Sequence, residues 1–460
     1  MERLGRDSFQ KVMGRTDVLA LAIGTIIGWG WVALTGNWVG VAGTAGATLA
    51  FVIGGIMFVL IGNIYAELAA ALPLAGGEIA FAYRALGYHF SLFAGWTITF
   101  AYIGVAAWEG IALTSALEYL FPDITFPWVM IGMAGAAGIA VLNYFGAKTT
   151  TIFQVIITSA MMLTGFLFFF SSVSFGSISN IDPLFTNKAG IVSVLLIIPS
   201  MLIGFDIIPQ FAEEMNIPPK QIANLLIFSI VICTFWYGFI IWGISLAAPS
   251  EVREEGLISV ADAIAYCMSS QTFGKIMICG GIFGIFSSWN GFMVAATRVL
   301  FAMGRAKMIG PVFGRLHPKY KTPSAAIVFV GLICTLSPLF GKQALLWLVN
   351  VSSFEAVVSY LLIAISFILL RKKEPELDRP YVFKFGVPLA YLVIVCLVML
   401  LFMYSPVGMG TLKWPYEWLM IFLWLVLGFG MTVYAGVKYS TVSKEEREAL
   451  IFGEKYSRDV

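Results

Sequence analysis

Twelve long apolar windows set the strongest limit on how this chain can fold. Crossing a bilayer as a helix takes about 20 apolar residues, and the windows have about that length. Only 12% of the 460 residues are charged, about half the fraction of a soluble domain, so a globular soluble enzyme is excluded. Backbone polar groups in lipid must be satisfied within their own segment, which leaves helices as the spanning element. We therefore expect an all-α membrane protein with 12 transmembrane helices, at 17–41, 45–72, 88–118, 127–145, 149–171, 190–215, 221–247, 272–302, 323–340, 343–370, 386–406 and 415–437.

Lysine and arginine set the predicted orientation. Twelve spans place both termini on one side of the membrane, and 23 of the 28 Lys and Arg residues fall on that side. Because cytoplasmic loops carry an excess of these residues, we expect a multi-pass protein of the cell membrane with both termini cytoplasmic. No polar stretch is long enough for a separate soluble domain; the longest are 248–271, 303–322, 371–385 and the C-terminal tail.

The first and sixth spans share a pattern that predicts interrupted helices. The residues that break or expose the backbone at mid-depth are Gly24, Gly28 and Gly30 in the first span and Pro199, Gly204, Asp206 and Pro209 in the sixth. Matching breaks indicate an inverted repeat of five plus five helices followed by two additional helices. The predicted divisions are a cytoplasmic N-terminus (1–16), a first repeat (17–171), a second repeat (190–370), two further spans (386–437) and a cytoplasmic tail (438–460).

The broken helix ends predict a binding site. Free N–H groups near Trp29 to Trp31 suit a carboxylate, and free carbonyls near Ser200 to Ile203 suit an ammonium or metal ion. Together they fit a zwitterionic amino acid. The alternative is that the glycines serve close helix packing.

Two acidic residues lie deepest in the predicted spans, Glu109 and Asp206. Glu109 follows Tyr102 by seven residues, which places both on one helix face. We interpret Glu109 as a proton acceptor or a partner for a cationic substrate group, the alternative being a neutral hydrogen bond to another helix. Glu67 and Arg298 lie nearer the cytoplasmic ends, where interfacial ion pairs compete with a gating role.

Five motifs in order resemble the amino acid–polyamine–organocation (APC) superfamily of secondary transporters. They are the glycine-interrupted first span, YAELAAALPLAGGEIAFAYRALG from Tyr65, the GFD…AEE…PP pattern from Gly204, FAMGRAKMIGPVFGRLHPKYKTP after Arg298, and RPYVFKFGVP from Arg379. The resemblance covers nearly the whole chain and implies the LeuT-like fold.

The resemblance also implies roles for individual residues. The carbonyls of Ile26, Ser200 and Ile203, with Gly204 beside them, would hold the substrate amino group. The amides around Gly28, Trp29 and Gly30 would hold its carboxylate. Trp289 falls at a substrate-contacting tryptophan, Glu109 lies close to a substrate-contact position, and Asp206 falls at an acid implicated in proton sensing.

Two departures from the family pattern affect the predicted mechanism. Trp29 stands where the family has a small residue, so its ring could narrow the pocket, stack on a substrate or gate it. The fifth span lacks the lysine of proton-coupled relatives and has Thr158, Ser159, Ala160 and Met161 near that position. Ser287 and Ser288 align with hydroxyls that bind sodium in sodium-coupled relatives, although serines also bond harmlessly within membrane helices.

These observations predict a permease that moves amino acids by alternating access, coupled to protons or driven by exchange. The alternatives are transport of an amine or polyamine without carboxylate recognition, and sodium-coupled symport. We expect no enzyme activity, since no convergent catalytic cluster is present, and no cofactor or metal. The expected partners are an amino acid or amine, a proton or sodium ion, and the lipid bilayer, with no nucleic acid.

Overall fold

The computed structural model describes residues 9, 11–255, 258–408 and 412–456. Of the predicted N-terminal segment, 1–8 and 10 therefore lie outside the described residues, as do 457–460 of the tail. Within the described residues the chain forms nineteen α-helices and two 3₁₀ turns. An isolated parallel bridge joins Met13 to Met215. The predicted all-helical class is confirmed.

Ten helical segments are long and apolar enough to cross a membrane. They are formed by α1 (Arg15–Ile26) with α2 (Gly30–Ala33), α4 (Thr44–Ala71), α6 (Tyr88–Leu120), α8 (Ala147–Phe175), α9 (Lys188–Leu202) with α10 (Ile207–Gln210), α11 (Pro219–Ala247), α14 (Gln271–Arg305), α16 (Lys342–Lys373), α17 (Gly386–Tyr404) and α18 (Tyr416–Lys438). Two further apolar helices are shorter, α7 (Trp128–Tyr144) and α15 (Ser324–Leu336) with the turn η2 (Ser337–Phe340). These twelve segments occupy the twelve apolar windows of the sequence.

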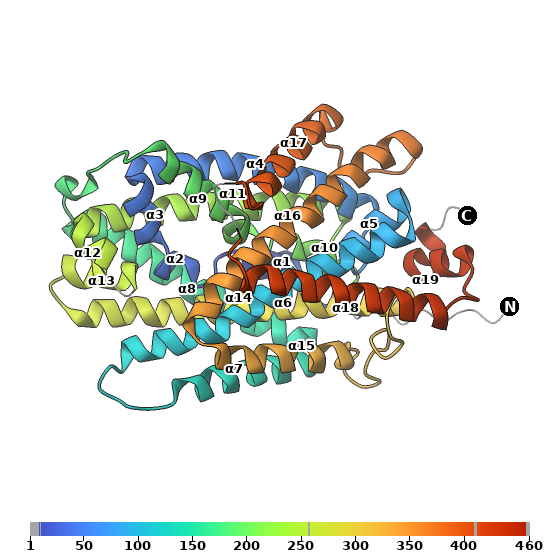
Figure 1. Cartoon of the computed structure of the whole chain (residues 1–460), viewed down its shortest axis with the longest axis horizontal. Helices are drawn as coiled ribbons and strands as arrows, with labels where there is room; N and C mark the ends of the chain where they lie inside the picture. The colour runs from blue at the N-terminus through green and yellow to red at the C-terminus, as the bar shows by residue number, and fades with distance from the viewer. Residues whose placement is uncertain (1–8, 10, 256–257, 409–411, 457–460) are drawn as a thin grey trace.

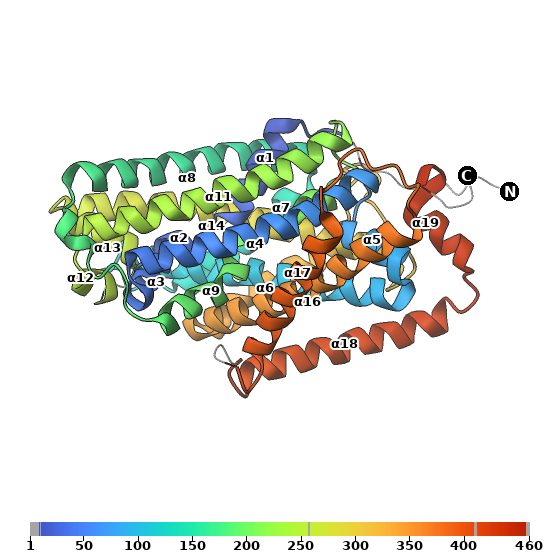
Figure 2. The same cartoon turned by 90° about the horizontal axis from the view of Figure 1, so that it is seen from above.

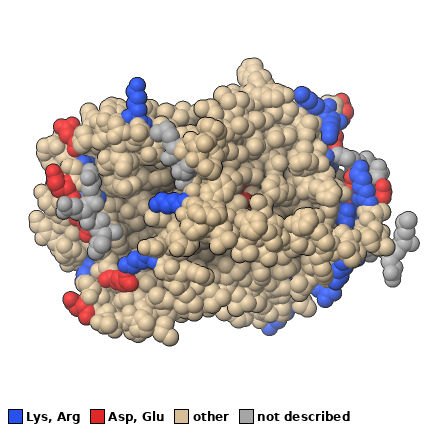
Figure 3. Space-filling model, viewed as in Figure 1, with Lys and Arg blue, Asp and Glu red and all other residues tan. Residues whose placement is uncertain are grey.

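The long helices run roughly along one axis of the molecule, and both termini lie at the same end (Figure 1). A view turned by 90° shows α18 along the outside of the bundle (Figure 2). On the face seen in Figure 3, most charged side chains gather toward the two ends, and few are visible in the band between them. Large apolar side chains such as Phe402 and Phe429 are exposed on the outer helices. This distribution suits a lipid-facing belt with polar surfaces at both ends.

Short helices lie outside the spanning segments, and one of them, at 35–42, takes up the end of the predicted first span, which stops at Ala33. They are α3 (Thr35–Ala42), α5 (Gly77–Leu86), the turn η1 (Ile178–Ile181), α12 (Ser250–Glu255), α13 (Ser259–Cys267) and α19 (Lys444–Tyr456). The sequence predicted only loops at 248–271 and in the tail. Helices form there because each buries one apolar face: Ala261 and Ile264 of α13 and Ile451 and Phe452 of α19 are buried.

Helix α1 lies against α14 through small residues. A Cβ added to Gly291 of α14 would lie 1.8 Å from Thr25 Oγ1, and one added to Gly24 of α1 would lie 2.0 Å from Ser287 Oγ. Both positions therefore accept only glycine in this packing. The close approach brings the interrupted part of the first span directly beside α14.

Candidate functional site

Both predicted helix interruptions are present. In the first span α1 ends at Ile26 and α2 begins at Gly30, so three residues leave the helix. In the sixth span α9 ends at Leu202, just after Pro199, and α10 begins at Ile207. Between them Gly204 has a φ of 116°, a conformation that suits glycine. The glycine and proline pattern therefore located both breaks.

The two interruptions touch each other. A Cβ added to Gly204 would lie 3.1 Å from the backbone nitrogen of Ile26. Beside them is a small cavity. Five helical segments line it, through Thr25, Ile26, Gly28, Gly30, Val105, Trp108, Glu109, Ser200, Met201, Tyr237, Ser288 and Phe292.

Glu109 supplies the carboxylate of this cavity. It is fully buried on α6 and accepts a hydrogen bond from the Ser288 hydroxyl. Its other oxygen, Oε2, accepts no hydrogen bond from the described residues. A Cβ added to Gly28 would lie 2.9 Å from Glu109 Oε1. The carboxylate therefore lies directly against the interrupted backbone of the first span.

Asp206 lies outside the cavity lining, at the interruption of the sixth span. Its carboxylate accepts a hydrogen bond from the Tyr102 hydroxyl at 2.8 Å and from the Gly204 N–H at 2.8 Å. Tyr102 and Glu109, which the spacing predicts on one face of α6, therefore have different hydrogen-bond partners. Although the helical spacing put the two side chains on one face, Tyr102 bonds across to Asp206, whereas Glu109 bonds to Ser288.

Several predicted binding residues keep their place beside the cavity. Ile26, Gly28, Gly30 and Ser200 line it, whereas Ile203 and Gly204 form the adjoining bend. The carbonyl of Ile26 already accepts a hydrogen bond from the Tyr237 hydroxyl at 3.3 Å.

The two predicted tryptophans point away from the cavity. The Trp29 ring packs on α14, since a Cβ added to Gly281 would lie 2.6 Å from its Cζ3 atom. Trp29 thus fills a glycine notch and does not narrow the cavity. The Trp289 ring lies between α6 and α7, where Cβ atoms on Gly110 and Gly135 would lie 3.5 and 3.2 Å from it.

From α14, Ser288 and Phe292 face the cavity instead. Tyr237 of α11 and Met201 of α9 also line it. Sequence reasoning missed Phe292, Tyr237 and Met201. The spacing of four between Ser288 and Phe292 was the available signal, because such residues share a helix face.

Ser287 and Ser288 do not converge on one point. Ser287 Oγ lies 2.7 Å from Gln154 Nε2 and 2.9 Å from Thr158 Oγ1, whereas Ser288 bonds to Glu109. Consecutive residues on a helix face different directions. Within the described residues, no group of three or more His, Cys, Asp or Glu side chains could hold a metal ion.

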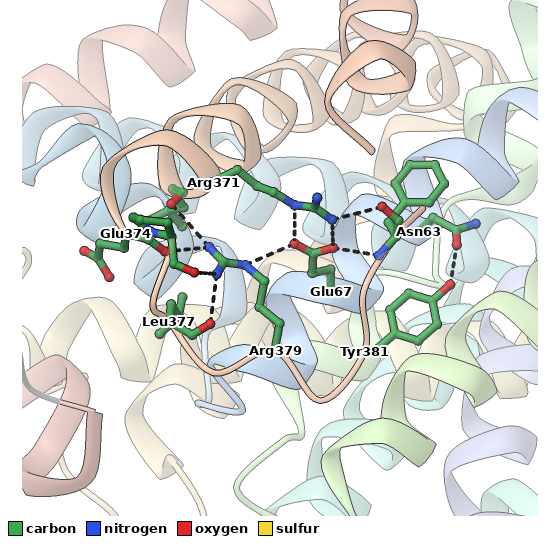
Figure 4. Close-up of polar contacts among 10 residues, drawn as sticks. Asn63, Glu67, Arg371, Glu374, Leu377, Arg379 and Tyr381 are labelled. Atoms are coloured by element: carbon green, nitrogen blue, oxygen red, sulfur yellow. Dashed lines mark hydrogen bonds and ion pairs between the residues drawn. The ribbon is translucent and has the colours of Figure 1, made fainter. Parts of the chain in front are cut away.

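Glu67 and Arg298 do not form a pair with each other. The Glu67 carboxylate binds Arg371, whose Nε lies at 2.7 Å, and Arg379, whose Nε lies at 3.2 Å (Figure 4). It also accepts the Phe383 N–H at 2.7 Å. This centre ties α4 to the end of α16 and to the segment that leads into α17.

Arg298 instead pairs with Glu214 at 2.8 Å, and both side chains are 2% exposed. Arg298 and Glu214 line a second cavity together with Phe9, Val12 and residues near Lys319. The ion pair thus lies between α14 and the segment after α10, next to the N-terminal segment.

A helical membrane bundle with two interrupted spans around a small polar cavity defines a membrane transporter. In a comparison with protein families, the amino acid permease family model matches residues 13–429. The chain therefore belongs to the amino acid permease family of the APC superfamily. It is a multi-pass membrane permease of an amino acid transport family and not an enzyme.

Curated relatives from Bacillus subtilis (strain 168) support this family assignment. The branched-chain amino acid permease BcaP is 28% identical over 404 residues, covering 82% of this chain and 84% of the relative. A methylthioribose transporter is 25% identical and covers 96% of this chain and 98% of the relative. An aspartate-proton symporter is 26% identical, with coverage of 82% and 76%.

Proposed function

We propose that this chain is a secondary transporter that carries amino acids across the cell membrane by alternating access, coupled to protons or driven by exchange. The observation that carries the proposal is the meeting of both helix interruptions at one small cavity that contains the Glu109 carboxylate. Interrupted spans leave backbone donors and acceptors at membrane depth, where only a cavity or ligand tolerates them.

The topology belongs to the proposal. Twelve spans would form the LeuT-like inverted repeat, with one repeat at 17–171, a second at 190–370 and two added helices at 386–437. The excess of Lys and Arg on the side of the termini supports cytoplasmic segments at 1–16 and 438–460. Family membership supports the repeat.

The substrate would bind at the two breaks. Backbone amides around Gly28, Trp29 and Gly30 would hold its carboxylate, and the carbonyls of Ile26, Ser200 and Ile203 its ammonium group. The place of the cavity beside both breaks supports this position for the substrate. Relatives named for branched-chain amino acids and aspartate support an amino acid.

Proton coupling would use Asp206 and Glu109, both fully buried. The printed name of one relative, an aspartate-proton symporter, supports a proton as the coupling ion. Sodium coupling through Ser287 and Ser288 receives less support, because their hydroxyls have different partners. An inner gate would use the Arg298–Glu214 pair, with Glu67 in a separate ion-pair centre.

A specific observation favours amines without a carboxylate as the second candidate. Glu109 lies against Gly28, so a carboxylate of the protein already occupies the neighbourhood of the first break. In that case the substrate would bring only a cationic group to Glu109.

Reconstituted protein tests both candidates. Liposomes containing the full chain are assayed for counterflow of the twenty proteinogenic L-amino acids, putrescine and ethanolamine, with protein-free liposomes as control. We expect flux for at least one amino acid. Flux of amines alone would select the second candidate, and absence of flux for every compound would refute the transporter proposal.

A further inference from the structure

Glu78 differs from two other buried acids of the bundle, Glu67 and Glu214. Glu67 binds Arg371 and Arg379, and Glu214 binds Arg298. Glu78 is fully buried at the start of α5 and forms no ion pair within the described residues. Burying an ionised carboxylate without a cation is costly. The position therefore demands a reason other than charge pairing.

An amide connects Glu78 to the interruption of the sixth span. Gln210, the last residue of α10, donates a hydrogen bond from Nε2 to Glu78 Oε2. The same Nε2 lies 3.3 Å from the backbone oxygen of Asp206. One side chain thus joins a carboxyl of α5 to the segment that carries the Asp206 carboxyl.

Aromatic rings enclose this region. The ring of Tyr65 lies 5.5 Å from Phe205, 5.8 Å from Tyr360 and 6.5 Å from Phe81, measured between centroids. All four rings are fully buried. The titratable groups that act on Glu78 from the surrounding elements are Asp206 and the phenols of Tyr65 on α4, Tyr102 on α6 and Tyr360 on α16. No cation is among them.

Glu78 lies outside the spanning segments. Its burial without a counter-charge strengthens proton binding to its carboxyl. Desolvation, reinforced by the nearby Asp206 carboxyl, raises the pKa of Glu78 to about 8. A carboxyl with that pKa holds its proton at neutral pH and releases it when water reaches it.

The hydrogen bonds that link Tyr102, Asp206, Gln210 and Glu78 run from the cavity toward one end of the molecule. Toward the cavity, Tyr102 bonds to Asp206 and its ring lies 5.8 Å from that of Phe292, a cavity residue. Toward the other end, α5 lies on the side of the molecule where both termini lie (Figure 1). Glu78 therefore stands between Asp206 and the end that we assign to the cytoplasm.

We propose that Glu78 is a second proton-binding residue of the transport cycle, which takes up one proton while its carboxyl closes against Gln210 and releases that proton to the cytoplasm when α5 and α10 separate. No covalent bond forms or breaks; the proton passes between water and the Glu78 carboxyl. The inference rests on the proposed transport function and extends its proton coupling beyond Asp206 and Glu109.

Infrared spectroscopy tests the proton site without a substrate. Difference spectra of the purified full chain between pH 7 and pH 9 should contain a carboxyl C=O band that Glu78→Gln removes. Glu118→Gln, a surface glutamate paired with Lys342 at 2.5 Å, is the matched control and should keep the band. A band that survives in Glu78→Gln would overturn the proposal. If Glu78→Gln does not yield monodisperse protein, Gln210→Met takes its place, and a band that neither shifts nor disappears in it also refutes the proposal.

Proteoliposomes test the role in transport, with L-leucine, L-lysine and putrescine as labelled probes and a trapped pH dye. The protonated fraction of a group with pKa near 8 changes about tenfold between pH 7 and pH 9. We expect Glu78→Gln to remove a change of about tenfold in net uptake between pH 7 and pH 9 and to lower the number of protons moved per substrate. The counterflow rate of the variant should stay within about twofold of the wild-type rate. Glu78→Asp should restore the pH dependence.

The outcomes separate this inference from the proposed function. A wild-type chain without flux of any probe or any compound of the wider panel refutes the transporter. Wild-type flux without proton movement refutes proton coupling, and with it the Glu78 inference, but leaves the transporter standing. The same holds if the variant and the wild type share one pH profile and one proton ratio.

Discussion

Replacing Glu67 by glutamine should strongly destabilise the fold. The Glu67 side chain is 1% exposed and receives Arg371, Arg379 and the Phe383 N–H. Glutamine keeps the shape, but it leaves two guanidinium groups without their counter-charge and turns an N–H group toward donors. Removing one partner of a buried ion pair costs about 3–5 kcal/mol. At an unfolding entropy of about 2 cal/mol/K per residue, a chain of this length loses about 1 °C of Tm per kcal/mol, so we expect a decrease of about 3–5 °C.

The chain carries its own reporters for this measurement. Cys233 and Cys334 are fully buried, whereas Cys279 is exposed and Cys267 and Cys396 are partly exposed. With these three replaced by serine, a thiol-reactive fluorophore in detergent detects unfolding. Glu118→Gln is the control, since its pair with Lys342 is largely exposed and contributes about 0–1 kcal/mol. Equal Tm values for the two variants would show that the Glu67 centre contributes no more than a surface pair. The double variant Glu67→Met with Arg371→Met should recover part of the loss, because removing a buried pair together is far less costly than breaking it.

Three further predictions concern the cavity and the tail. Gly28→Ala should weaken substrate affinity by about tenfold or more, since its Cβ would lie 2.9 Å from both Glu109 Oε1 and Ser288 Oγ; counterflow at graded substrate concentrations measures this, and unchanged affinity would remove the first break from the site. Glu109→Gln should reduce the pH dependence of uptake to the part that Glu78 supplies, while exchange continues, and an unaltered profile would make Glu109 structural. Phe452→Ala should release α19, because this buried ring packs 6.0 Å from Tyr83 and beneath Arg84; faster proteolysis of the tail is the readout, and wild-type resistance would contradict it.

The sequence was most informative where the backbone itself carried the signal. Glycine and proline marked both interrupted spans, because these residues weaken a helix locally. They did not mark the broken positions one by one, since Gly24, Pro199 and Pro209 lie inside helices. The apolar windows likewise located the ten helical segments that are long enough to cross a membrane and the two shorter apolar helices, since lipid exposure depends on composition.

Side-chain directions and partners could not be predicted in the same way. Trp29 and Trp289 turn toward glycines on other helices, a match that exists only after packing. Glu67 found its partners Arg371 and Arg379 more than 300 positions away, and Arg298 took Glu214 instead. Such pairings depend on which helix ends meet, and no local pattern records that.

The seat of α1 on α14 has a mechanical consequence. At Gly24 and Gly291 the two helices approach closely, and the small hydroxyl groups of Ser287 and Thr25 face the two glycines. No large side chain of α1 or α14 interdigitates at these two positions. A contact made of small residues is smooth, so displacement by about an ångström disturbs few rotamers, whereas interdigitated large side chains resist such sliding. The helix that carries the first break can therefore slide along α14 with little side-chain rearrangement. A methyl group added at Gly24 or Gly291 would clash with the facing hydroxyl and oppose that movement.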